Sequence, residues 1–289
     1  MKLKMMTIPV VMLALTFMTT RPLEKKLSNR LDTNLTKCHA TTQKFARLGS
    51  DPSFIRAHED PESHPFQGVG KMITFPVADG ADANAYFLKS EPASKDYLFV
   101  VHEWYGLNTN VKEEADKFFK QYKNMNVVAL DLYDGQVADN RDDAARYMQS
   151  VKTERALAII NGAKSFAGAD ARIFTVGWCF GGGWSLQTAI ELGDQAAGAV
   201  MFYGMPERDI DRLKTLKCDV LAIFAGQDQW ITPEVATQFE KDMATASKKL
   251  TLKSYDAGHG FANPSNPIYN EEAATDAYKN MTAFVKARR

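Results

Sequence analysis

Short apolar runs alternate with longer segments of helical periodicity from about residue 70 to the end of the chain. The runs between residues 97 and 226 are continuous and rich in β-branched and aromatic residues, as expected for strands that are buried on both faces. We expect strands at 72–77, 84–89, 97–102, 126–133, 172–178, 198–204, 219–226 and 250–256. We expect helices at 111–122, 142–167, 182–192, 233–246 and 271–287. The first two strands are expected to form an antiparallel entry pair.

This alternation predicts an α/β fold with a mostly parallel sheet and helices on both faces. Residues 68–289 are long enough to form one such domain. Ligands of these folds bind at the carboxyl ends of the strands. The residues that directly follow each strand are therefore the first place to look for chemistry.

The chain before this domain divides into two parts. Residues 1–20 carry two lysines and then an apolar run that is short for a membrane span. This pattern predicts a secretory signal peptide, with an uncleaved N-terminal anchor that tethers the protein to a membrane as the alternative. Residues 21–67 are polar and lack sustained periodicity, so we expect a tether or a wrap over the main domain.

Composition narrows the class of protein. Lysine and arginine number 35 and aspartate and glutamate number 35, and this balance argues against a nucleic-acid binder. Apolar residues make up 45% of the chain and charged residues 24%, which is typical of a globular protein. We expect a monomer that is held together by its hydrophobic core, because three cysteines are too few to staple a chain of this length.

Cysteines and histidines of the N-terminal part suggest little chemistry of their own. Cys38 and Cys218 are candidates for a disulfide if the protein is exported to an oxidising compartment. His39, His58 and His64 lack a recognisable metal-ligand spacing. We therefore expect surface or packing histidines and no metal site.

A glycine-flanked cysteine follows the strand expected at 172–178. Gly177-Trp178-Cys179-Phe180-Gly181 has the form G-x-C-x-G and precedes a helical pattern. This strand–turn–helix setting is typical of a nucleophile elbow, in which bulky neighbours of the nucleophile would clash. The alternative is a buried cysteine in a glycine-rich turn.

Two later strand ends carry an acid and a base. Asp228 follows the strand expected at 219–226, and His259 lies in a glycine-flanked loop after the last strand. The chain order nucleophile, aspartate, histidine is that of the α/β-hydrolase fold. Asp256 is a rival acid, although a residue so close to the histidine more plausibly shapes the turn. An ordinary turn aspartate and loop histidine are the alternatives for Asp228 and His259.

These residue types suit nucleophilic catalysis. A histidine within hydrogen-bond reach can take the proton of a thiol, while an aspartate orients the imidazole and stabilises its charged form. The thiolate of Cys179 would attack a carbonyl and form a thioacyl intermediate that water then cleaves. The oxyanion needs preorganised donors, and we expect the backbone N–H groups of Phe180 and Trp104 to supply them. This chemistry needs no cofactor.

Five ordered sequence blocks resemble the dienelactone hydrolase family of α/β-hydrolases. The blocks are VVHEWYGLN, ALDLYDGQ, GWCFGGG, AGQDQWITPE and GHGFANP. The resemblance spans roughly residues 72–287 and implies a small-molecule ester or lactone as substrate. It also implies a Cys179–His259–Asp228 triad, and a glutamate, here Glu103, that exchanges a proton with the thiol.

Alternatives remain for the residues around Glu103. Burial at the end of an apolar strand would disfavour its charge, but a rim glutamate paired with a lysine would also fit. His102 would either shape the pocket or serve as a hydrogen-bonded core residue. Tyr105, Trp178 and Trp230 predict an aromatic-walled substrate pocket, with core packing as the alternative.

The chain departs from the family in its arginines. Well-characterised dienelactone hydrolases grip a substrate carboxylate with arginines after the DLY block and after the catalytic histidine. Here those places read Asp134-Gly135 and Phe261-Ala262-Asn263. Arg141 and Arg146 lie close in sequence, but the pattern gives no sign that they point inward. Dienelactone itself is therefore not the expected substrate.

The sequence predicts an exported cysteine-dependent hydrolase of carboxylic esters or lactones. A secreted binding or scaffold protein that kept the fold but lost turnover is a second possibility, favoured by the missing arginines. A thioesterase or an acyl transferase is a third, because all of these enzymes share the acyl-enzyme step.

Overall fold

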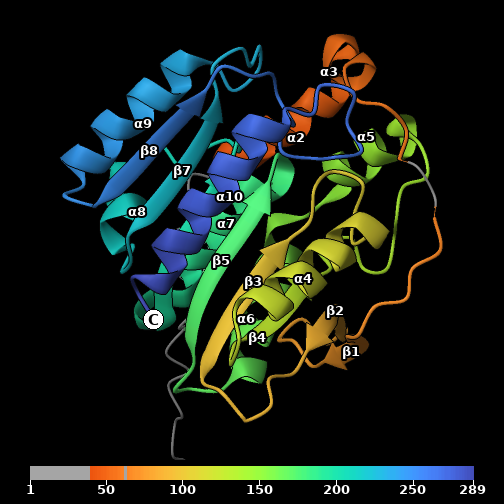
Figure 1. Ribbon diagram of the computed structural model, residues 1–289, viewed down its shortest axis with the longest axis vertical. Helices are drawn as coiled ribbons and strands as arrows, with labels where there is room; N and C mark the ends of the chain where they lie inside the picture. The colour runs from red at the N-terminus through yellow and green to blue at the C-terminus, as the bar shows by residue number, and fades with distance from the viewer. Residues whose placement is uncertain (1–39, 62–63) are drawn as a thin grey trace, which may run out of the picture. The chain divides into compact units, whose positions relative to one another are not determined.

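The computed structural model describes residues 40–61 and 64–289. The eight strands in these residues form one sheet (Figure 1). The strands are β1 (Lys71–Phe75), β2 (Ala83–Leu88), β3 (Asp96–Val101), β4 (Asn126–Leu130), β5 (Arg172–Trp178), β6 (Ala196–Phe202), β7 (Val220–Ala225) and β8 (Leu250–Tyr255). Their order in the sheet is β1-β2-β4-β3-β5-β6-β7-β8. β1 and β2 run antiparallel to their neighbours and the other pairs are parallel. The predicted α/β fold and the antiparallel entry pair are confirmed.

Helices cover both faces of this sheet. Those that match expected segments are α4 (Thr109–Gln121), α7 (Phe180–Leu192), α9 (Pro233–Thr245) and α10 (Glu271–Lys286). Figure 1 shows α4 and α10 in front of the sheet and α7 behind it. On the front, Phe118 of α4 and Tyr278 of α10 bring their ring centroids to 6.2 Å. The central strands are consequently apolar on both faces, and every residue of β4 and β7 is buried.

One predicted helix is wrong in its extent. The segment expected at 142–167 is two helices, α5 (Arg141–Ser150) and α6 (Thr153–Ala167). Val151 and Lys152 between them are extended, with ψ of 115° and 128°. A β-branched residue tolerates this conformation well, and no glycine or proline marks the break in the sequence. A short helix, α8 (Ile210–Thr215), and two 3-10 turns, η1 (Arg47–Ser50) and η2 (Gly193–Gln195), were not predicted.

The polar N-terminal segment is more ordered than its pattern suggested. It forms α2 (Ala40–Ala46), η1 and then α3 (Pro52–Arg56). Asp51 caps α3 by accepting a hydrogen bond from the Ser53 N–H, with proline at the first helical position. Phe54 of α3 is fully buried. This segment therefore wraps the domain, as one of the two expectations had it, and it contributes to the core.

Several predictions fall outside the described residues. These are the signal peptide or anchor at 1–20, the part of the extension up to residue 39, and Cys38 with its candidate disulfide to Cys218. They stay predictions. Within residues 40–61 and 64–289, the helices are all too short or too polar to cross a bilayer.

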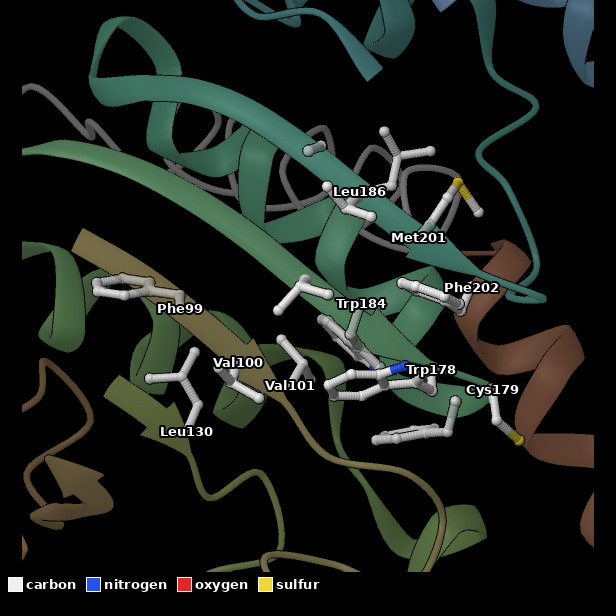
Figure 2. Packing of buried hydrophobic residues seen from close by; sticks show 14 of the residues in the cluster. Phe99, Val100, Val101, Leu130, Trp178, Cys179, Trp184, Leu186, Met201 and Phe202 are labelled. Atoms are coloured by element: carbon white, nitrogen blue, oxygen red, sulfur yellow. The ribbon is translucent and has the colours of Figure 1, made fainter. Parts of the chain in front are cut away.

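Part of the core lies beneath the carboxyl end of β5. Figure 2 shows Val101, Trp178 and Phe202 packed together there, with Cys179 at the margin of the cluster. The sulfur of Cys179 points away from Trp178 and toward the N-terminal segment. The side chain that the sequence analysis selected as the nucleophile is thus itself buried in the core, at 3% exposure.

Candidate active site

Cys179 occupies a sharp turn between β5 and α7. Its φ of 55° and ψ of −119° are unfavourable for a residue with a side chain. A Cβ at Gly177 would lie 2.1 Å from the Gly181 carbonyl oxygen, and a Cβ at Gly181 would lie 2.3 Å from that of Val101. Both glycines are therefore needed for α7 to pass this close to β5 and β3. The G-x-C-x-G pattern thus reflects the backbone geometry of a nucleophile elbow.

Cys179, His259 and Asp228 form a hydrogen-bonded chain. His259 Nε2 lies 3.2 Å from Cys179 Sγ, and His259 Nδ1 lies 2.6 Å from Asp228 Oδ2. The other carboxylate oxygen of Asp228 accepts hydrogen bonds of 2.9 Å from the N–H groups of Trp230 and Ile231. The Asp228 carboxylate is therefore held in place while it fixes the tautomer and orientation of His259.

Burial and mutual charge shape the pKa values of these three groups. Burial is the largest influence on Cys179 and raises the pKa of its thiol. Burial opposes charge on His259, but Asp228 and then Cys179 outweigh it and raise the pKa of the imidazole well above its usual value. Burial would raise the pKa of Asp228 too, but the neighbouring His259 outweighs it and lowers that pKa. An ionised Asp228 therefore stabilises a proton on His259.

The rival acid lies elsewhere. Asp256 Oδ1 accepts a 2.8 Å hydrogen bond from the side chain of Gln227 at an exposed position. The structure thus brings Asp228 to His259 and leaves Asp256 in the turn.

Glu103 is a half-buried carboxylate that lines two cavities. Burial, its largest influence, raises its pKa to about 7. Its Oε2 accepts a 2.8 Å hydrogen bond from Asn263 Nδ2. The partner of Glu103 in this contact is therefore an amide, and not the rim lysine that the sequence analysis considered. Cys179 faces His259 in this structure, so the proton exchange between Glu103 and the thiol stays a prediction.

The two expected oxyanion donors flank the sulfur. Phe180 is the first residue of α7, so its N–H has no acceptor within the helix. This N–H lies against Cys179 and favours the thiolate. Trp104 is 1% exposed and lines the same small cavity as Cys179. Their role as oxyanion donors stays a prediction.

His58 is a site residue that the sequence analysis did not select. It is 8% exposed, and its ring lies 5.6 Å from that of His259 and 4.6 Å from that of Trp104, centroid to centroid. Burial is the main reason that its pKa falls to about 3. It is a packing histidine, as expected, but it packs at the nucleophile. The Asp51-Pro52 pair, a helix start followed by Phe54, was the available signal.

A sulfur and two imidazole nitrogens gather at this point. One ligand atom each from His58, Cys179 and His259 lies within 4.8 Å of the other two. These atom types suit transition-metal binding. The sequence shows no metal-ligand spacing, because these three residues are far apart along the chain and meet only in the folded protein.

The aromatic residues divide between the cavities and the packing behind them. Tyr105 lines the cavity of Cys179, and its hydroxyl donates to the Glu59 carbonyl. Trp230 packs against His259 at a centroid distance of 5.8 Å. Trp178 lines a second cavity and stacks on Phe118. Only Tyr105 of the three expected pocket residues therefore lies at the sulfur's own cavity.

Two hollows meet at Glu103. The one that Cys179 and His259 line has about 30 Å³, space for a water molecule but not for an ester. The neighbouring one has about 270 Å³ and is lined by Trp178, Tyr278 and several polar residues. Glu103, Asn110, Asn263 and Ser265 line both hollows and form the partition between them.

Neither arginine that the sequence analysis considered serves as a clamp here. Arg141 Nε lies 3.3 Å from Asp60 Oδ1, and the Arg141 N–H donates to the same oxygen at 2.8 Å. Arg146 pairs with Asp143 on the surface. Among the described residues, the linings of both hollows contain no arginine.

His102 is a hydrogen-bonded core residue. Its Nδ1 donates to the Glu103 carbonyl at 2.6 Å, and its Nε2 accepts from the Leu132 N–H at 3.1 Å. It is fully buried, and burial lowers its pKa to about 4. Its hydrogen bonds connect the end of β3 to the end of β4, and it lines neither of the two hollows.

The comparison with family models decides where the chain belongs. The model of the dienelactone hydrolase family matches residues 83–288, which include Glu103, Cys179, Asp228 and His259. The chain belongs to the dienelactone hydrolase family. It is thereby a member of a family of hydrolases that act on ester bonds.

Individual relatives and structures agree with this membership. "Protein usf" of Aquifex pyrophilus is 26% identical over 231 residues, covering 75% of this chain and 98% of the relative. Carboxymethylenebutenolidase 1 of Cupriavidus pinatubonensis is 24% identical, covering 68% of this chain and 88% of its own. A dienelactone hydrolase-like promiscuous phosphotriesterase from metagenomic libraries superposes with a TM-score of 0.65 at 18% identity, over 76% of this chain and 99% of that one. This superposition supports the dienelactone hydrolase fold alone.

Proposed function

We propose that the protein hydrolyses carboxylic esters or lactones with Cys179 as nucleophile. The observation that carries this proposal is the 3.2 Å approach of His259 Nε2 to Cys179 Sγ at a strained elbow. Membership of the dienelactone hydrolase family supports the reaction class. The carboxymethylenebutenolidases among the relatives support a lactone or ester bond as the point of attack.

The reaction runs in two steps. In the first, the Cys179 thiol gives its proton to His259 and the sulfur attacks the acyl carbon, while the N–H groups of Phe180 and Trp104 receive the charge on the carbonyl oxygen. The carbon–oxygen bond then breaks, and the imidazolium returns its proton to the departing alkoxide. In the second step, His259 takes a proton from water, and the hydroxide displaces the thiolate and releases the carboxylic acid.

Glu103 is proposed to keep the thiol available until substrate binds. A carboxyl group whose pKa is about 7 exchanges protons readily near neutral pH. Its ionised form would take up the thiol proton reversibly in the resting enzyme and return it, so that the thiol still carries the proton that His259 removes in the first step. This role rests on the family resemblance together with the position of Glu103 on the wall of the cavity that contains Cys179.

The larger hollow favours a neutral or cationic substrate. Glu103, Glu113 and Glu114 line it, with Lys117 and His64 as the opposing side chains. Lys117 pairs with Glu114, and His64 pairs with Glu113. These pairings leave no free cation in the lining of this hollow as the structure describes it, so a substrate carboxylate would meet negative charge. Neutral esters and lactones are therefore the proposed class.

Cleavage of p-nitrophenyl esters by the purified protein tests the proposal. Cys179→Ala is expected to abolish turnover, and Cys218→Ala, at the other described cysteine, is the matched control and is expected to retain it. Equal rates for wild type and Cys179→Ala would defeat the proposal. Stoichiometric acylation of Cys179 without turnover would instead support a binding protein, and transfer of the acyl group to an added alcohol would support an acyl transferase.

Export is a further part of the proposal. It rests on the lysines and apolar run of residues 1–20. Expression of the full chain in a bacterium, with the mass of the mature protein determined from each cell fraction, tests it. A protein that keeps residues 1–20 and stays in the soluble cytoplasm would contradict export and the membrane tether together.

A further inference from the structure

His58 adds a third ligand atom to the two that the candidate active site already contains. His58, Cys179 and His259 offer two imidazole nitrogens and a sulfur within 4.8 Å of one another. His58 comes from the segment after α3, outside the part of the chain that the family model matches. The third ligand atom therefore comes from a segment that the family model does not cover.

Each of the two histidines has its Nδ1 engaged by an oxygen atom, so Nε2 is the nitrogen that it can offer to a metal. His58 Nδ1 lies 2.7 Å from the Phe54 carbonyl, so it carries the proton and leaves the lone pair on Nε2. His259 Nδ1 lies 2.6 Å from Asp228 Oδ2, and its Nε2 faces Cys179 Sγ at 3.2 Å. Metal-binding histidines typically donate the other ring N–H to a carbonyl or a carboxylate.

The spacing also suits a small metal ion. Tetrahedral zinc with bonds of about 2.0–2.1 Å to nitrogen and about 2.3 Å to sulfur needs ligand atoms about 3.3–3.7 Å apart. The 3.2 Å between His259 Nε2 and Cys179 Sγ is near this range, and a contraction on the order of 1 Å brings in His58. The 30 Å³ cavity that all three residues line leaves room for a water molecule as the fourth ligand.

We propose that His58, Cys179 and His259 form a binding site for Zn²⁺ that switches off the nucleophile. Zinc would accept lone pairs from the two imidazoles and from the sulfur, and the thiol proton and the proton held on His259 Nε2 would both leave to solvent. The bound metal would occupy the sulfur lone pair that attacks a substrate and the His259 nitrogen that takes a proton. The site needs the three side chains but not turnover, so it stands or fails separately from the proposed ester hydrolysis.

Titration of the full-length protein with Cd²⁺ is the first test, because a cadmium–thiolate bond absorbs in the ultraviolet. We expect one equivalent of Cd²⁺ to produce this band and Zn²⁺ to displace it. His58→Asn is the key variant, because its amide can still donate to the Phe54 carbonyl but has no counterpart of Nε2. We expect it to weaken Zn²⁺ binding at least about tenfold. His64→Asn, at a histidine outside the cluster, is the matched control and should bind as wild type does.

Inhibition and alkylation give independent readouts. Zn²⁺ should inhibit ester cleavage and protect Cys179 from iodoacetamide. In His58→Asn, both effects should require a Zn²⁺ concentration at least about tenfold higher. Each effect is expressed relative to the rate of the same protein without metal. If His58→Asn does not fold, His58→Gln and the stoichiometry of the wild-type band decide the question. A wild-type protein without a thiolate band, or a folded His58 variant with unchanged Zn²⁺ affinity, would overturn the site.

Discussion

Asn263 Nδ2 donates a 2.8 Å hydrogen bond to Glu103 Oε2, across the partition between the two hollows. Asn263 stands in the loop after His259, where the family resemblance led us to expect an arginine. An amide stabilises the ionised carboxylate less than a guanidinium would. Burial therefore still raises the pKa of Glu103 to about 7.

Replacement of Asn263 by alanine should move the pH profile. The lost hydrogen bond favours the ionised carboxylate, so its removal raises the pKa of Glu103 further. We expect the acidic limb of ester cleavage to shift to higher pH by about one unit. Ser265→Ala, which removes a partner of Asn263 but not of Glu103, is the control. A lower rate with an unshifted limb would exclude Glu103 from the proton exchange.

Asp228 and Asp256 can be separated by matched substitutions to asparagine. Asp228→Asn should lower kcat by about 10³–10⁴-fold, because an amide can no longer hold His259 in the productive tautomer. Asp256→Asn should change kcat by less than about threefold, since its contact is with Gln227 at the surface. Steady-state kinetics of both variants checks this, and a large loss in Asp256→Asn alone would reverse the assignment.

Acid should destabilise the fold through His58. Its pKa is about 3 in the folded protein and about 6.5 when unfolded, so the unfolded chain binds the extra proton between these values. The stability that neutral His58 contributes is therefore complete above about pH 6.5 and is lost as the pH falls toward 3. Between pH 7 and pH 5 we expect this residue to account for about 2 kcal/mol of lost unfolding free energy.

Urea unfolding of His58→Asn at both pH values measures this contribution. Between pH 7 and pH 5, the free energy of unfolding should fall by about 2 kcal/mol less in the variant than in wild type. His64 forms a half-exposed ion pair with Glu113. His64→Asn should therefore change the decrease in unfolding free energy between pH 7 and pH 5 by no more than about 1 kcal/mol. Identical acid losses in wild type and His58→Asn would show that His58 does not stay neutral.

The Tyr105 hydroxyl donates to the Glu59 carbonyl and so ties the N-terminal segment over Cys179. Tyr105→Phe should let this segment open more often, because a hydrogen bond contributes about 0.5–1.5 kcal/mol. We expect Cys179 to react with iodoacetamide about two- to tenfold faster. Tyr147→Phe, at a half-buried tyrosine beside Arg146 and outside the lining of the Cys179 cavity, is the control. An unchanged rate would mean that the reagent enters by another route.

The elements that the sequence predicted well are those with strong local signals. Each expected strand appears in the sheet. Central strands such as β4 and β7 were recognisable because strands buried on both faces form unbroken apolar runs. The proximity of Cys179, Asp228 and His259 also followed, since parallel strands bring their carboxyl ends to one edge.

Features that depend on distant contacts were missed. His58 and Phe54 lie on a segment whose helices, α2 and α3, have seven and five residues, too few for a recognisable periodicity. They are buried by aromatic side chains that are distant in sequence, including Trp104 and Trp230. The break at Val151 was hidden for a similar reason, because the extended conformation there requires neither glycine nor proline.

The Phe54 ring packs edge-on to the His259 imidazole at a centroid distance of 5.9 Å. A recombinant fragment trimmed to the family match at residue 83 would discard this ring and leave the imidazole open to solvent. Such a fragment would report the kinetics of an altered enzyme, so truncation studies of this protein should start before Ala40, where α2 begins.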